Sequence, residues 1–136
     1  MSIWLILIIL VLALTMLWWI GRMGPRRARF SDKERAIISD RWQYIEGLAM
    51  KDRHKEAIME ADKLVDFAFR EMKLRGETFA DRLKSAEKLL PNYQDIWSAH
   101  KLRNQLAHEI DTEVNPRTAE SALQTFKQTL KHLKAI

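Results

Sequence analysis

Three side chains near the middle of the second half of the chain have the chemistry to act on a phosphate ester. Arg103 and Asn104 are adjacent, and His108 follows after three further residues. Histidine exchanges protons near neutral pH, and a guanidinium group can bind a phosphate through two parallel hydrogen bonds. The set therefore predicts a catalytic centre in which His108 moves a proton, Arg103 stabilises negative charge and Asn104 orients the histidine or the phosphate.

The helix that must position these residues is predicted to run from about residue 93 to residue 110. At 100° per residue, His100, Asn104 and His108 form one row with steps of four residues. The side chains expected to support this row are Trp97, His100 and Lys101.

Arg103 lies at the border of the apolar face of that helix, about 140° around the axis from His108. A charge at such a border must reach solvent, pair with an opposite charge or face another chain. We expect either that Arg103 pairs with Asp62 or Asp66 of the preceding long helix, or that two copies of the chain meet and line one cleft. The second arrangement predicts a homodimer.

The order R-N-x-x-x-H on a late helix of an all-helical chain resembles the signature of the HEPN superfamily. This resemblance implies a small helical bundle that works as a dimer with a composite cleft, and the superfamily includes metal-independent ribonucleases and non-catalytic relatives. The segments Glu-Ala-Asp-Lys-Leu and Trp-Ser-Ala-His-Lys-Leu-Arg-Asn-Gln-Leu-Ala-His-Glu, behind an apolar N-terminus, also resemble short membrane proteins of bacteria with reduced genomes.

The N-terminal segment is an 18-residue run, residues 3–20, that is apolar except for Thr15. At 1.5 Å per residue it reaches roughly 27 Å, close to the thickness of a bilayer's hydrocarbon. A cleaved signal peptide fits less well, because no basic residue precedes the run and no small-residue cleavage site follows it. The run therefore predicts a single transmembrane helix within residues 1–21.

The charges around this run predict its orientation. Residues 22–35 carry six basic and two acidic side chains, whereas residues 36–136 carry 17 basic and 16 acidic ones. Because basic residues stay on the cytoplasmic side, we expect an outside N-terminus, a domain in the cytoplasm at the plasma (inner) membrane, and contact with the bilayer and its anionic headgroups. The residues expected at the membrane boundary are Trp18, Trp19, Arg22, Arg26, Arg27 and Arg29.

The rest of the chain shows helical periodicity throughout. It predicts an all-α fold in which a basic juxtamembrane linker, residues 22–30, leads into an antiparallel bundle of four or five helices over residues 31–136. The expected helix starts are a capping box at Ser31, caps at Asp52 and Thr78, and Asn115 before a proline. The second helix of the bundle is expected to end at Gly76. The boundary between the first and second helices, near Lys51, is the least distinct, because the two could be continuous.

Several functions are disfavoured by the composition. The chain has no cysteine, which excludes disulfides and thiol chemistry. His100 and His108 lie two turns apart, and no H-x-x-x-H or phosphate-binding glycine loop occurs, so no metal or cofactor is expected.

Two functional hypotheses remain. In the first, the domain is a membrane-anchored dimerisation or adaptor module, with Arg103, Asn104 and His108 in a polar layer that fixes helix register. In the second, it is a metal-independent endoribonuclease that cleaves single-stranded RNA with Arg103 and His108.

Overall fold

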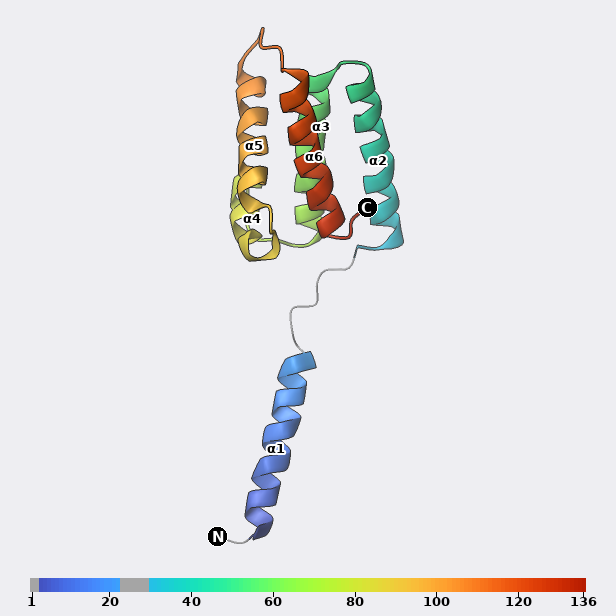
Figure 1. Ribbon diagram of the computed structural model, residues 1–136. Helices are drawn as coiled ribbons and strands as arrows, with labels where there is room; N and C mark the ends of the chain where they lie inside the picture. Colours follow the sequence, from blue (N-terminus) through green and yellow to red (C-terminus); the bar gives the residue numbers. More distant parts are fainter. Residues whose placement is uncertain (1–2, 23–29) are drawn as a thin grey trace.

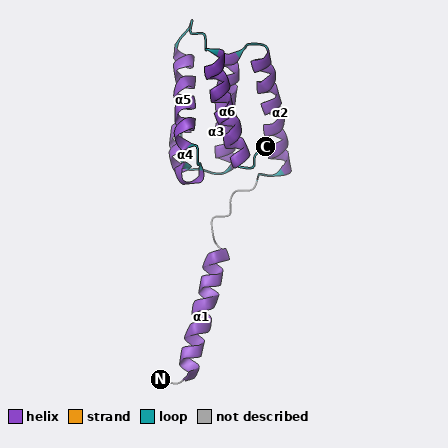
Figure 2. Ribbon diagram, viewed as in Figure 1, coloured by secondary structure: helices purple, strands orange, loops and turns teal. Residues whose placement is uncertain are grey.

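The computed structural model describes residues 3–22 and 30–136, with side chains described for residues 3–19 and 30–136. The described part is all-helical, which agrees with the all-α prediction (Figures 1 and 2). Its elements are α1 (Ile3–Arg22), α2 (Asp32–Met50), α3 (His54–Glu71), α4 (Phe79–Ser85), a 3₁₀ turn η1 (Glu87–Leu89), α5 (Tyr93–His108) and α6 (Pro116–His132).

Helix α1 does not support the predicted membrane span. Among the residues that the structure describes, no helix combines the length and the apolar character needed to cross a membrane. The predictions of a transmembrane anchor, a single-pass topology and a plasma-membrane location are therefore corrected.

Because the membrane span is not supported, the residues predicted to lie at the membrane boundary are no longer assigned that role. Trp18 and Trp19 are exposed side chains of α1, and Arg22 is its last residue. Arg26, Arg27 and Arg29 lie outside the described residues, as does most of the predicted linker.

The start of α2 follows the sequence prediction, and the start of α3 does not. Ser31 and Glu34 form the expected capping box at α2. The two helices are separate, with a break after Met50. Asp52 does not cap α3, because its backbone has a φ of 58°; the cap position is Arg53, whose side chain makes no capping hydrogen bond. Asp is one of the few residues that tolerate this left-handed conformation.

The connection from α3 to α4 depends on Gly76. Helix α3 ends at Glu71, five residues before the glycine, so the predicted end is wrong. Gly76 instead has a φ of 139°, and a Cβ atom there would lie 2.5 Å from the Cβ of Asp81. Only glycine permits this close return of the chain, after which Thr78 caps α4 as predicted.

The last two helices begin where the sequence indicates. Asn115 accepts a hydrogen bond from the Arg117 backbone, and Pro116 occupies the first turn of α6. Helix α5 ends at His108, two residues before the predicted end, and Ile110 beyond it is 94% exposed.

The bundle comprises α2 to α6, with successive long helices antiparallel (Figure 1). Helix α3 is central, since it packs against α2, α4, α5 and α6, and α6 also packs against α5. The fully buried side chains come from all of these elements and include Phe69 and Phe126 at the centre. Helix α2 packs mainly on α3, which leaves a groove between α2 and α6.

Candidate functional site

Helix α5 divides the predicted site residues into two groups. His100 is 8% exposed and faces α3, and Arg103 and Asn104 are half-buried beside it. His108, the last residue of the helix, is exposed. The structure therefore brings together His100, Arg103 and Asn104, while His108 lies apart from them.

A buried carboxylate of α3 completes the first group. Asp62 is 4% exposed, and its Oδ1 lies 2.8 Å from Nδ1 of His100. Its Oδ2 lies 3.4 Å from Nε of Arg103, as an ion pair. The sequence prediction that Arg103 pairs with Asp62 or Asp66 is confirmed, and Asp62 is the partner.

Asn104 closes these contacts into a ring. Its Oδ1 accepts a hydrogen bond of 3.0 Å from Nη1 of Arg103, and its Nδ2 lies 3.2 Å from Nε2 of His100. We call Asp62, His100, Arg103 and Asn104 the polar ring. Nε of Arg103 is buried and makes no hydrogen bond to any described residue, so the ring ties the guanidinium to Asp62 by charge rather than by a well-aligned bond.

The donors and acceptors of the polar ring run in one direction. Arginine can only donate, so Asn104 must turn its oxygen toward Arg103 and its NH₂ group toward His100. Nε2 of His100 must then accept. The imidazole proton therefore lies on Nδ1, where it is donated to Asp62.

Two aromatic rings contact the imidazole of His100. The ring of Phe79, from α4, stacks on the imidazole with centroids 4.3 Å apart. Trp97, one turn earlier on α5, meets the imidazole edge-on at 6.2 Å and also contacts Tyr93. Lys101, also predicted to support the row, is exposed.

A second ion pair lies beside the polar ring and was not predicted from the sequence. Arg82 of α4 donates to both oxygens of Asp66, at 2.7 and 3.0 Å, and its Nη1 donates to the carbonyl of Gly76 at 2.8 Å. The hydrogen bond that Arg82 donates to Asp66 raises the pKa of Arg82. Only the turn at Gly76 brings α4 against α3, so no local spacing in the sequence indicates this pair.

The polar ring and Asp66 border a hollow of about 340 Å³ between α3, α4 and α5, which we call the α3–α5 hollow. It is lined by Asp62, Lys63, Asp66, Thr78, Phe79, Ala80, His100, Arg103 and Asn104. His108 is not one of the lining residues. Among the described residues, no group of three or more metal-binding side chains lies close enough together to hold an ion.

A larger and more apolar concavity lies on another side of the bundle. It measures about 400 Å³ and lies between α2 and α6, with the N-terminus of α3 at one end. We call it the α2–α6 groove. It is lined by Trp42, Ile45, Glu46, Ala49, Met50, Asp52, His54, Pro116, Glu120, Leu123, Gln124 and Lys127.

Comparison of the chain with protein-family models, curated proteins and solved structures gave no match. The resemblance to the HEPN superfamily therefore stays a prediction that depends on the R-N-x-x-x-H motif. The predicted partners, namely a second copy of the chain, RNA and anionic headgroups, also stay predictions.

Proposed function

We propose that the helical bundle is a protein-interaction module in which Arg103 and Asn104 hold α5 against α3. The polar ring is the observation that supports this most directly. The guanidinium that would bind a phosphate already has Asp62 as its counter-ion and Asn104 as a hydrogen-bond partner. A phosphate would have to displace a carboxylate that is buried and would lose its charge partner, which is energetically costly.

The position of His108 supports the same proposal. A nuclease needs its proton-transfer group within reach of the phosphate that the arginine binds. His108 is exposed at the end of α5, outside the α3–α5 hollow that Arg103 lines. The apolar α2–α6 groove, in contrast, is a surface suited to a protein partner.

The test compares RNA cleavage with stability in the full chain, dispersed in mild detergent because the side chains of α1 are apolar and exposed. Parent, His108→Ala and Arg103→Ala proteins are incubated with single-stranded RNA and EDTA, and unfolded with urea. We expect no cleavage by any of them. We also expect Arg103→Ala to lower the free energy of unfolding by about 2 kcal/mol, because Asp62 loses a charge partner, and His108→Ala to change it by less than about 0.5 kcal/mol.

Arg103→Lys is the matched control, since it keeps the positive charge but loses the planar donor group that bonds to Asn104. Its stability should lie between those of the parent and Arg103→Ala. Cleavage by the parent that leaves 2′,3′-cyclic phosphate ends, and that is lost in a stable His108→Ala protein, would overturn the proposal in favour of the ribonuclease.

A further inference from the structure

The direction of the hydrogen bonds in the polar ring leaves room for one proton on His100. Nε2 of His100 accepts from Nδ2 of Asn104, at 3.2 Å, because Oδ1 of Asn104 accepts from Nη1 of Arg103, at 3.0 Å. A second proton on the imidazole would set two donors against each other at Nε2. Asn104 can accept that proton only by turning its amide over, which points its NH₂ group at a guanidinium that also can only donate. A doubly protonated His100 and a bond between Asn104 and Arg103 therefore exclude one another.

The net charge of the polar ring leads to the same conclusion. With one proton on His100, the carboxylate of Asp62 balances the positive charge of Arg103. A second proton makes two cations share one carboxylate. His100 has the closer contact with it, 2.8 Å from Nδ1 to Oδ1, against 3.4 Å from Nε of Arg103 to Oδ2. The ring would then carry a net positive charge where water has little access, which is costly.

The other charges around His100 already have partners. The charged side chains in and beside the α3–α5 hollow are Asp62, Lys63 and Asp66 of α3, Arg82 of α4, and Arg103 of α5. Asp66 is paired with Arg82, and Lys63 is paired with Glu60. The two aromatic rings against the imidazole carry no charge. Of the charged groups just named, the carboxylate of the ring is therefore the one that both cations must share.

Burial decides which of the two cations moves away. His100 is 8% exposed, and its imidazole is stacked on Phe79. The side chain of Arg103 is 27% exposed, and its Nε makes no hydrogen bond to any described residue. A long side chain at the border of solvent can carry its charge into water while its methylene groups stay packed. Arg103 is therefore the member of the ring that can leave.

We propose that the polar ring is a proton-operated latch, in which a second proton on His100 turns the Asn104 amide over and releases Arg103 toward solvent. In the closed state, Arg103 and Asn104 hold α5 against α3. In the open state, His100 keeps its bonds to Asp62 and Asn104, and the contact of Arg103 with α3 is lost. This inference rests on the part of the proposed function that assigns Arg103 to the contact between the two helices, and it adds regulation by acid.

The test follows both side chains in the full chain, dispersed in mild detergent, between about pH 8 and pH 5, where histidines ordinarily titrate. Nitrogen-15 spectra report the second proton on His100, whose signals are assigned by elimination from glutamine variants of the other three histidines. The hydrogen-exchange rate of the Nε–H group of Arg103, assigned with Arg103→Lys, reports release. The reference rate is that of Arg117, which is exposed.

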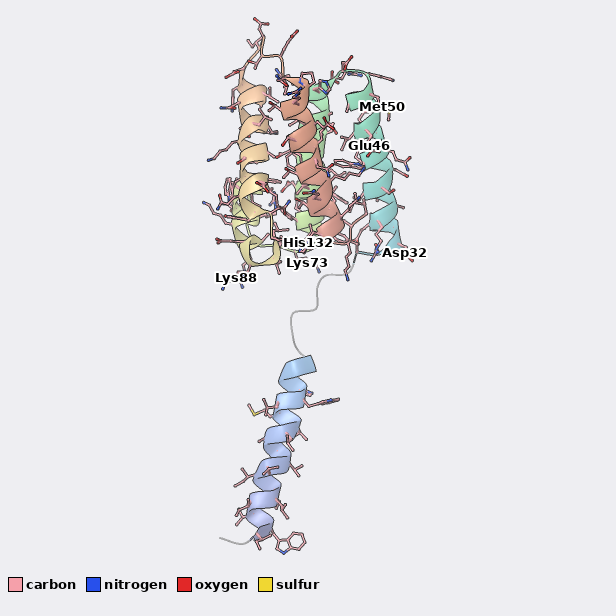
Figure 3. All side chains as sticks on the ribbon, viewed as in Figure 1. Asp32, Glu46, Met50, Lys73, Lys88 and His132 are labelled. Atoms are coloured by element: carbon pink, nitrogen blue, oxygen red, sulfur yellow. The ribbon has the colours of Figure 1, made fainter. Side chains whose placement is uncertain are left out.

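We expect the protection of Arg103 against exchange to fall about tenfold over the pH interval in which His100 gains its second proton. Loss of one hydrogen bond to a charged group allows a factor of this size. An exposed histidine at the C-terminal end of α6, His132, supplies a control (Figure 3). His132→Gln should leave the response of Arg103 unchanged.

Asn104→Asp is the matched control for the latch itself. A carboxylate can accept from Arg103 and from a protonated Nε2 of His100 at the same time. The two states no longer exclude one another in this variant, so Arg103 should stay protected over the whole pH range.

The latch is ruled out if Arg103 keeps its protection while His100 gains the second proton, or if His100 gains none down to about pH 5. It is also ruled out if Asn104→Asp loses the protection of Arg103 as the parent does. The proposed function is judged by a different result, because it fails only if the parent chain cleaves RNA and the His108→Ala chain does not.

Discussion

At the scale of single residues, Asn104 sets the direction of the hydrogen bonds in the polar ring. It links a side chain that can only donate, Arg103, to one that can do either, His100. The sequence placed Asn104 in the candidate site as an orienting group. The structure shows that the histidine it contacts is His100, one turn before it, rather than His108, one turn after it.

The position of the imidazole proton is a direct test of the polar ring. We expect His100 to carry its proton on Nδ1 and a lone pair on Nε2, because Asn104 presents an NH₂ group to Nε2. Nitrogen-15 spectra of histidine-labelled protein distinguish the two nitrogens. An imidazole of His100 protonated on Nε2 alone would contradict the direction that we assign to the ring.

A substitution of Asn104 supplies the control for this test. In Asn104→Asp both side-chain oxygens accept, so Nε2 of His100 should become protonated in the same spectra. The isosteric change alters the direction of the bond while leaving the packing of α5 nearly unchanged.

At the scale of the elements, three helices begin at side-chain caps that the local sequence encodes, whereas the packing of the helices depends on contacts between distant residues. The capping residues Ser31, Thr78 and Asn115 are visible in the sequence and function as expected. Asp52, predicted to cap α3, and Gly76, predicted to end it, do neither, because both residues adopt a positive φ in the connections on either side of α3.

Gly76 gives a prediction at this scale. Gly76→Ala should lower the free energy of unfolding by about 2 kcal/mol or more, because a Cβ atom would collide with Asp81 and the backbone φ is unfavourable for alanine. Urea unfolding measures the change. The close approach of α4 to α3, and with it the Arg82–Asp66 pair, depends on this turn.

Gly47 is the matched control, since it lies inside α2 and a Cβ atom there would contact nothing within 4 Å. Gly47→Ala should raise stability by roughly 0.5–1 kcal/mol through helix propensity. If the two variants had equal effects, the role assigned to Gly76 would be wrong.

At the scale of the whole molecule, an ion pair between Glu46 and Lys127 links α2 to α6. The ammonium of Lys127 and the indole of Trp42 donate to Glu46, and these bonds lower the pKa of Glu46 below its usual value. A lowered pKa in the folded state means that the unfolded chain binds the proton more readily. The pair therefore stabilises the fold at neutral pH, and this contribution is lost as the pH falls from the usual carboxyl pKa through the lowered one.

The expected effect is modest, because the Glu46 side chain is 42% exposed and solvent screens the pair. Glu46→Gln should lower the free energy of unfolding by about 0.5 kcal/mol at pH 7 and by progressively less toward pH 3. Urea midpoints at several pH values measure this difference.

The double variant with Lys127→Gln isolates the ion pair. In that background the effect of Glu46→Gln should shrink. An undiminished effect would assign the stabilisation to Trp42 alone.

The sequence by itself determined the helical elements and most of their faces. Periodic apolar residues and side-chain caps act within a few residues of one another, so they can be recognised without the fold. The same local reasoning placed Arg103 at the edge of an apolar face and predicted a carboxylate partner on the preceding long helix, which the structure confirms. The transmembrane span was predicted from the run of apolar residues alone, and the structure does not support it.

Only the tertiary structure decided which carboxylate is the partner. Asp62 and Asp66 are one turn apart on the same side of α3, so spacing along the chain cannot distinguish them. The choice depends on where along α3 each neighbouring helix packs. Arg103 of α5 pairs with Asp62, and Arg82 of α4 pairs with Asp66. The same long-range packing draws His100 into the ring and leaves His108 in solvent, because the relative position of two helices is set by contacts between residues far apart in the sequence.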